Sequence, residues 1–393
     1  MTETIASTAD AVTAHFMVTP FRAGTYTGLA NAASGVTPSQ NNLGLFSGTL
    51  TATGSFSGRV NFAGTSTLFT ATFDAHSGDA ARTIGAFSYD LHLDLDDPGT
   101  DKITGTVVTA GGECDVDADR CVFSVTNKTP DEFLKAGDNT KNGIYTVVFP
   151  ALPSQDGLTS NDYPQGDGIG TLTVTPLGVV SLAGALADGT TVTASAKMSK
   201  IFAWPMVVII KSTTTITGMT LGGMVQFDTT PADSDVAAVD LQWFRPARAG
   251  APSYPSGWPA GISTYLTGAK FATLASSSEL PGLDTPNPAG NAVLEFQGGL
   301  LTSTITKYLN ISSTNIVTKI PTTDTSYTLS LSATTGAFSG TFTPNWASPA
   351  LVKPTFKGIL IQKGDNQGGY GFFLSNSTGG TGAESGNVTL SAP

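Results

Sequence analysis

The chain has 393 residues, enough for two or three domains with a buried core in each. Charged residues make up only 12% of it and glycine contributes 45 residues, so serine and threonine fill most positions expected to be exposed. The net charge of −11 argues against a nucleic-acid partner, which needs a basic stripe, and against an anionic membrane surface.

Residues 1–20 are predicted to form an N-terminal extension. Residues 1–14 are polar and lack the basic start and long apolar core of a signal peptide. We therefore expect that an export signal was removed or that the chain is a segment of a longer polypeptide. The extension turns apolar at Phe16, Met17 and Val18, which are candidates for docking onto another copy by strand addition. A disordered tail is the alternative.

Alternation of Thr, Val, Leu and Phe with small polar residues predicts β-strands along most of the chain. Examples are GTLTAT at 48–53, GTLTVT at 170–175 and YTLSLS at 327–332. Helical spacing occurs only at 130–135, PDEFLK. The longest apolar run, IFAWPMVVII at 201–210, is too short to cross a bilayer as a helix, so no transmembrane helix is expected.

A hairpin pattern recurs three times, as TLTATGSFSGRVNF at 49–62, TLTVTPLGVVSLAGAL at 171–186 and TLSLSATTGAFSGTF at 328–342. Each copy reads as a strand, a turn and a second strand. The turns need a residue with positive φ, and the second strands need a buried side chain near their start. The residues predicted to supply these are Gly54, Gly178 and Gly336 for the turns and Phe56, Val180 and Phe338 for the buried positions.

The spacing of these copies predicts an all-β fold of antiparallel β-barrels or sandwiches, built from repeated hairpin units and gathered in two globular bodies. Residues 21–128 form the first β domain and 141–248 begin the second. The Pro/Gly-rich stretch at 249–290 is expected to be a connecting loop. Residues 291–393 complete the second domain or form a third β unit.

Several segments carry a resemblance to a known class of protein. The series GTLTVTPLGVVSLAGALADGTTVTASAKM, WPMVVII, GMTLGGMVQF, LQWFRPA, GAFSGTFT, FKGILIQK, GGYGFFLS and GNVTL resembles the C-terminal β-repeat region of large secreted or autotransporter-like bacterial surface proteins. The resemblance covers about 140–393 well and 20–128 weakly. It implies a structural role at the cell surface or outside the cell, and it identifies no functional residues.

The two cysteines, Cys114 and Cys121, lie in GGECDVDADRCVF. A short loop between strands could bring them within disulfide distance, and two free thiols are the alternative. The same stretch places Asp115, Asp117 and Asp119 at alternate positions, a candidate calcium site on a flexible loop. A solvated acidic turn is the alternative. A second acidic cluster, at Asp94, Asp96, Asp97 and Asp101, is expected to be a hairpin tip.

Two aromatic residues of the predicted loop, Tyr254 and Trp258, are candidates for stacking on a glycan because flat rings on a Pro-stiffened loop lose little freedom on binding. Packing over an open barrel end is the alternative for both.

Catalysis needs titratable groups that converge, and the sequence is poor in them. No G-x-S-x-G, H-E-x-x-H, Walker-type or dinucleotide motif occurs, and the three histidines, His15, His76 and His92, stand apart. The sequence therefore predicts a non-enzymatic structural or adhesive surface module, a candidate subunit of a filament or surface layer. Its partners would be copies of itself or neighbouring surface proteins. A carbohydrate-binding module is the second hypothesis and an outer-membrane β-barrel the third.

Overall fold

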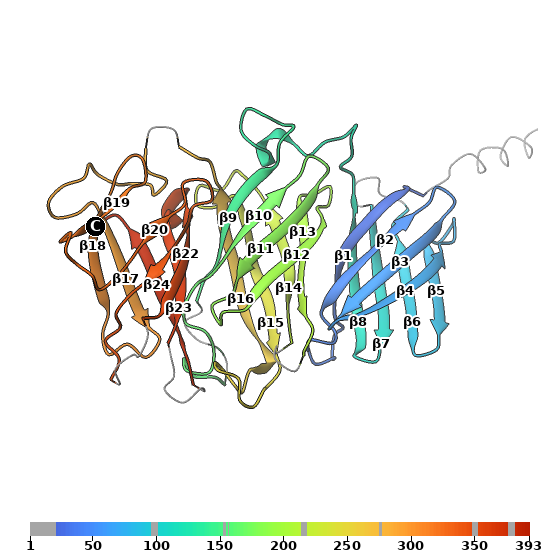
Figure 1. Cartoon of the computed structure of the whole chain (residues 1–393). Coiled ribbons are helices and arrows are strands. Elements are labelled where there is room, and N and C mark those ends of the chain that lie inside the picture. The colour runs from blue at the N-terminus through green and yellow to red at the C-terminus, as the bar shows by residue number, and fades with distance from the viewer. Residues whose placement is uncertain are drawn as a thin grey trace, which may run out of the picture.

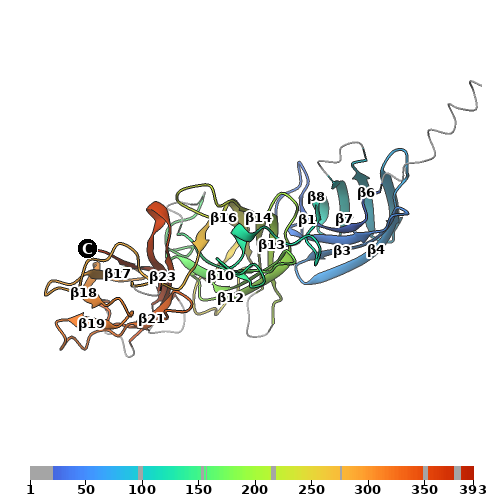
Figure 2. The ribbon, with the colours of Figure 1, turned by 90° about the horizontal axis from the view of Figure 1, so that it is seen from above.

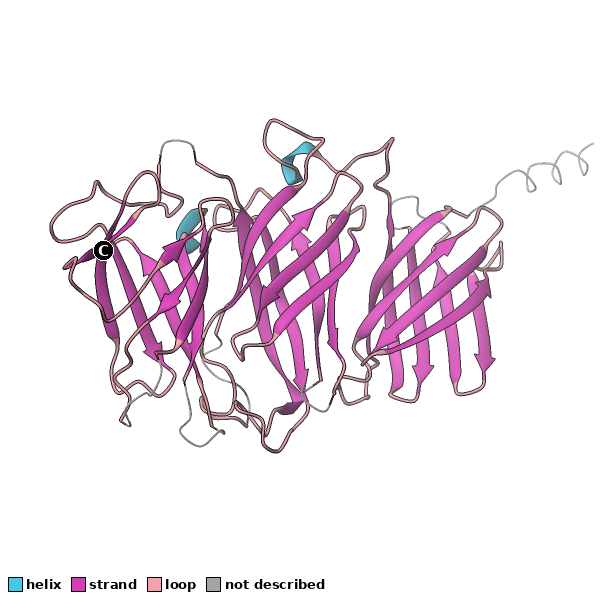
Figure 3. Ribbon diagram, in the orientation of Figure 1, coloured by secondary structure: helices cyan, strands magenta, loops and turns pink. Residues whose placement is uncertain are grey.

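The structure is a computed structural model that describes residues 21–95, 101–151, 155, 157–213, 218–274, 277–347, 353–375 and 382–393. Within these residues the fold is all-β, with three eight-stranded antiparallel sheets and two short 3-10 helices at Asp131–Phe133 and Gly364–Asn366. Each sheet curls into a nearly closed barrel, and the three barrels stand in a row (Figure 1). Strands dominate throughout, as Figure 3 shows. The predicted all-β class is confirmed.

Barrel 1 is an up-and-down meander in which each strand pairs with the next, and the first strand also pairs with the eighth. No pairing joins the fourth strand to the fifth, so the barrel has one open seam, between β4 and β5. Its strands are β1 (Gly24–Ala32), β2 (Gly44–Leu50), β3 (Ser55–Phe62), β4 (Thr65–Thr72), β5 (Asp79–Ile84), β6 (Phe87–Leu93), β7 (Lys102–Thr109) and β8 (Gly112–Cys121).

Barrel 2 repeats this topology, with β9 paired to β16 and the seam between β12 and β13. Its strands are β9 (Gly143–Phe149), β10 (Gly168–Val174), β11 (Val179–Ala185), β12 (Thr191–Lys197), β13 (Ala203–Ile210), β14 (Met219–Phe227), β15 (Val236–Arg245) and β16 (Trp258–Lys270).

Barrel 3 pairs β17 with β24 and has its seam between β19 and β20. The sequence left open whether residues 291–393 complete the second domain or form a third β unit, and in the structure they form a third unit. Its strands are β17 (Ala292–Gly298), β18 (Ile305–Ile311), β19 (Val317–Ile320), β20 (Ser330–Leu331), β21 (Ala337–Thr341), β22 (Thr355–Ile361), β23 (Gly368–Leu374) and β24 (Ser385–Ser391). We expected two globular bodies, whereas the structure has three barrels, each with a core of its own.

The recurring hairpin pattern occupies β2–β3, β10–β11 and β20–β21. Its three turn glycines have φ of 85° at Gly54, 74° at Gly178 and 67° at Gly336, the left-handed region that a tight turn requires. The three residues predicted to be buried after the turn, Phe56, Val180 and Phe338, are at most 2% exposed. The predicted hairpins are confirmed.

Aromatic rings packed on glycines explain why the pattern alternates Gly with Phe. Gly58 of β3 pairs with Phe69 of β4, and a Cβ on Gly58 would lie 2.3 Å from that ring. In barrel 3, Gly358 of β22 pairs with Phe338 of β21, and a Cβ there would lie 1.9 Å from the ring. Each glycine leaves room for the ring of the neighbouring strand inside the barrel.

The structure corrects the predicted connecting loop at 249–290, because Trp258–Lys270 forms β16 and closes barrel 2 against β9. Pro, Gly and Ser are dense on both sides of this stretch and obscured the alternation of ISTYLTGAK within it. The predicted helical segment at 130–135 is a single 3-10 turn over Asp131–Phe133.

The structure also corrects the disulfide, because Cys114 and Cys121 are free thiols on one strand, β8. Seven residues along an extended strand span about 23 Å, whereas the two Cα atoms of a disulfide lie roughly 4.4–6.8 Å apart. An odd separation also directs the two side chains to opposite faces: Cys114 lies in the core of barrel 1 and Cys121 outside it.

Candidate functional site

The junction between barrels 1 and 2 is built on a buried carboxylate. Asp101, 4% exposed and next to the start of β7, has Oδ1 2.9 Å from Nε of Arg22 and Oδ2 3.4 Å from Nη1 of Arg120. Its Oδ2 also lies 3.5 Å from Nζ of Lys200, which follows β12 of barrel 2. One acid therefore holds the start of β1, the end of β8 and the neighbouring barrel together.

Backbone and thiol contacts extend this junction. The Lys200 N–H donates to the Arg120 carbonyl over 3.1 Å, and the Cys121 thiol lies 3.4 Å from the Thr27 hydroxyl and 3.9 Å from the Lys197 carbonyl. Burial raises the pKa of Cys121 and raises that of Cys114 to about 12, so both thiols stay protonated at neutral pH. They act as packing groups.

The junction between barrels 2 and 3 is apolar at its centre. Val148 and Ala269 on the outside of barrel 2 pack against Ile359 and Ile361 of β22. Nearby, Ala185 and Ala187 pack against Phe372 of β23. A barrel wall normally buries one face only, whereas β9 is almost entirely buried because both of its faces are covered.

Polar groups at the edge of this junction fix the register of the two barrels. The Asp167 N–H donates to the Gly371 carbonyl over 3.1 Å, and its Oδ2 accepts from Nδ2 of Asn387 at 2.7 Å. Its Oδ1 accepts from the Ala151 N–H at 2.9 Å. Burial raises the pKa of Asp167, while the bonds from Ala151 and Asn387 lower it in part because N–H donors favour the ionised carboxylate.

Tyr254 and Trp258, proposed as glycan platforms, are only 5% and 2% exposed. The Trp258 ring lies edge-on to Trp243 with centroids 4.7 Å apart and 5.2 Å beneath the Arg245 guanidinium carbon. The Tyr254 hydroxyl accepts from the Ser385 N–H of barrel 3 at 2.6 Å. Buried rings cannot stack on a sugar, so the packing alternative is correct for both.

A buried ion pair between Asp188 and Arg245 lies against this aromatic group, with the guanidinium over the Trp258 ring. Asp188 lies 3.6 Å from Nε of Arg245 and accepts from the Thr190 N–H and hydroxyl at 2.9 and 2.8 Å. Arg245 also donates to the carbonyls of Tyr254 and Ser253, at 2.8 and 3.1 Å. These bonds fix the loop that carries Tyr254 toward barrel 3.

The proposed calcium residues do not form a site. Asp115, Asp117 and Asp119 lie at alternate positions of β8 and not on a loop, so their carboxylates spread along the strand. Asp117 pairs with Lys102 at 2.7 Å, and burial raises the pKa of Asp119. Across the described ranges, no three His, Cys, Asp or Glu side chains gather in a way that could hold a metal ion.

Of the second acidic cluster, Asp96 and Asp97 lie outside the described residues, as do His15 and the docking candidates Phe16, Met17 and Val18. His92 is on β6 with Nδ1 2.8 Å from Asp79 of β5, both more than half exposed, and His76 is an exposed loop residue. Neither lies near a nucleophile in a closed pocket.

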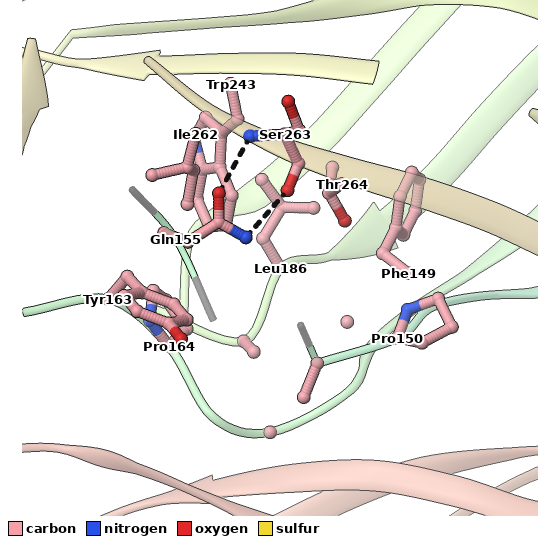
Figure 4. A pocket seen from close by; sticks show the side chains of 14 residues that line it. Phe149, Pro150, Gln155, Tyr163, Pro164, Leu186, Trp243, Ile262, Ser263 and Thr264 are labelled. Atoms are coloured by element: carbon pink, nitrogen blue, oxygen red, sulfur yellow. Dashed lines mark hydrogen bonds between the residues drawn. The ribbon is translucent and has the colours of Figure 1, made fainter. Parts of the chain in front are cut away.

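A small cavity at one end of barrel 2 is shown in Figure 4. The side chain of Gln155 closes it, donating to the Ser263 carbonyl and accepting from the Ser263 N–H, each at 3.1 Å. The cavity has about 20 Å³, and the Trp243 ring borders it. That volume holds about one water molecule, so the cavity cannot take a substrate.

A larger groove of about 490 Å³ lies between barrels 1 and 2. Three of its polar side chains already have partners: Asn42 bonds to Ser39 and to Thr37, and Gln242 bonds to Asp240 and to Ser263. The groove offers no convergent free donors or acceptors from these residues for orienting a ligand.

No protein-family model matches the chain, and no curated protein matches it. In the described part, no helix is long and apolar enough to span a membrane. Sequence reasoning missed the residues that build the junctions: Arg120, Lys200, Asp167 and Asp188 carry no local signal, and Asp101 was assigned to an acidic hairpin tip. The two junctions thus combine ion pairs, hydrogen bonds and apolar contacts between residues that lie far apart in the sequence.

Proposed function

We propose that this chain is a non-enzymatic structural or adhesive module of the bacterial cell surface or extracellular space, in which the barrels act as a stiff spacer. The observation that carries this proposal is the pair of junctions, which hold three barrels in one row (Figures 1 and 2). Spacers need length and stiffness, and a row of barrels provides both.

The chemistry of the junctions supports stiffness. A flexible array would join its barrels by exposed polar linkers, which lets the domains move independently. Here apolar side chains are buried between barrels 2 and 3, and the Asp101 carboxylate is buried between barrels 1 and 2. Bending either junction would expose these groups to water at a cost in free energy.

The two other hypotheses have less support. The carbohydrate-binding hypothesis depended on Tyr254 and Trp258, which are buried. An outer-membrane barrel carries its apolar band on the outside and polar residues within, whereas apolar residues fill the interiors of all three barrels here.

Two measurements test the proposal. Small-angle scattering of the purified chain should give the distance distribution of one extended rigid particle. Protease treatment of intact cells of the bacterium that makes it should remove the protein while cytoplasmic markers survive. A compact or freely jointed particle would contradict the spacer, and protection of the protein inside intact cells would contradict the location.

A further inference from the structure

We propose that the free edge of β4 in barrel 1 is an interaction surface for a second copy of this chain, which pairs with it through its own β4. The proposal deepens the structural role proposed above by naming the partner and the strand. It begins from the edges of the sheets, because an unpaired strand edge readily adds another strand.

Six strands bound the three described sheets, and β4 differs from the others. Charges or proline protect four of them, and β20 is only two residues long. The protecting residues are Asp79 and Arg82 in β5, Lys197 in β12, Pro205 in β13 and Lys319 in β19. By contrast, β4 reads TSTLFTAT over eight residues, with no charge and no proline. Such a strand is well suited to pairing.

Alternate backbone groups of β4 point away from β3 toward the seam, and one of them, the Thr70 carbonyl, is already bonded to Tyr89 of the same barrel. The Thr70 carbonyl accepts from the Tyr89 hydroxyl of β6 at 2.7 Å, so it faces away from β3. Since hydrogen-bonding direction alternates along a strand, Ser66, Leu68 and Thr72 also present their N–H and C=O groups to the seam. Their side chains are exposed, and that of Leu68 is 69% exposed.

The position of β4 leaves room for a partner. β4 and β5 lie at the end of the row farthest from barrel 2 (Figure 1), and no backbone pairing joins the two strands. A hollow of about 570 Å³ beside the edge is lined by Ser57, Arg59, Leu68, Thr70 and Ile84, among others. Ile84 is 42% exposed, so both sides of the hollow offer apolar surface.

Two observations favour a second copy of this chain as the partner: the way barrels 1 and 2 already pack on each other, and the net charge of the molecule. β1 and β2 of barrel 1 lie against β13, a seam strand of barrel 2, so seam strands already serve as packing surfaces between barrels. In the described residues, no further barrel covers the seam of barrel 1. Two molecules of net charge −11 repel each other, and a charge-free edge minimises that repulsion where they meet.

Antiparallel pairing of two β4 strands about a two-fold axis would place Leu68 opposite Leu68 of the second copy. The same surface is used on both molecules, so the assembly closes as a dimer and does not grow into a filament. The expected product is a rod of twice the length, joined at the two barrel 1 ends.

Sedimentation equilibrium of the full chain between 1 and 100 µM tests this proposal. We expect a monomer–dimer equilibrium that Leu68→Lys weakens at least 10-fold, because it places two like charges opposite each other. Thr70→Pro should act similarly, since it removes an N–H that points away from β3. Val239→Lys, at a 92% exposed position of β15, is the matched control and should leave the equilibrium unchanged.

Cross-linking tests the register without a destabilising change. Oxidised Leu68→Cys should give a covalent dimer, and Thr306→Cys on the exposed face of β18 should not. Three results would overturn the proposal: a monomer at every concentration, equal weakening by Val239→Lys, or dimers that form only after residues 1–20 are removed. The last result would mean that those residues occupy the edge instead. None of these three results changes the outcome of the scattering and protease tests, so a failure of the dimer can be told apart from a failure of the spacer.

Discussion

The hydroxyl of Tyr254 accepts a hydrogen bond from the backbone N–H of Ser385 over 2.6 Å, which joins a loop of barrel 2 to the first residue of β24 in barrel 3. Both residues are buried, so this bond has no water to replace it. The relationship makes Tyr254 a part of the junction between the two barrels.

Tyr254→Phe should therefore destabilise the junction. The substitution leaves the Ser385 N–H buried without its acceptor, at a cost of about 1–3 kcal/mol. Hydrogen exchange should show faster exchange of the Ser385 amide. Tyr265→Phe, at a position 37% exposed, is the control and should change neither exchange nor stability. Unchanged protection at Ser385 in Tyr254→Phe would show that the bond contributes nothing.

Asp101→Asn should loosen the other junction. Three cations lie around this carboxylate, and removing its charge leaves them facing one another in a partly buried place. The expected loss is about 3 kcal/mol, the lower end for a broken buried ion pair. Scattering should show a broader distance distribution as barrel 1 moves relative to barrel 2. Asp90→Asn on the exposed side of β6 is the matched control, and an equal response from both variants would contradict this role.

Trp258→Ala should destabilise barrel 2 by about 3–5 kcal/mol because it leaves a cavity beside Trp243 and removes the ring under Arg245. Denaturant unfolding measures this loss. Tyr308→Ala, where the ring is 50% exposed, should cost far less. A small effect of Trp258→Ala on stability, together with a change in the tryptophan fluorescence of the unsubstituted chain when a sugar is added, would support the glycan hypothesis instead.

Asp167 makes the junction between barrels 2 and 3 sensitive to pH. Burial raises its folded pKa above the ordinary value of 3.8, so its contribution to stability is complete below that value and is lost as pH rises through the folded pKa. Asp167→Asn cannot ionise, but its single oxygen can accept from only one of the two donors, Ala151 and Asn387, at any pH. The melting temperature of the variant relative to the unsubstituted chain should therefore be more favourable at pH 7 than near pH 4. A relative melting temperature that is more favourable at pH 4 would contradict this sign.

The thiols of Cys114 and Cys121 should react slowly with a thiol reagent in the native protein and quickly in denaturant, since both are buried and their pKa values are raised. A reducing agent should leave the melting temperature unchanged. Finding no reactive thiol in denaturant without reductant would show that a disulfide exists.

Prediction from the sequence succeeded where the decisive contacts are local. Gly54 and Phe56 were assigned correctly because a tight turn and the alternation after it involve only neighbouring residues. The same alternation runs through Cys114, Val116 and Ala118 of β8, whereas the acidic residues between them led us to expect a loop there. That reading produced the disulfide and calcium hypotheses together.

The sequence by itself determined the all-β class, the hairpin turns and the buried positions that follow those turns, because strand periodicity and glycine conformation are properties of short segments. Only the tertiary structure decided that Asp101 meets Lys200, that Tyr254 meets Ser385 and that β4 is left with a free edge. These outcomes depend on which distant segments close each barrel and on how one barrel packs on the next, and no local pattern encodes contacts between residues so far apart in the sequence.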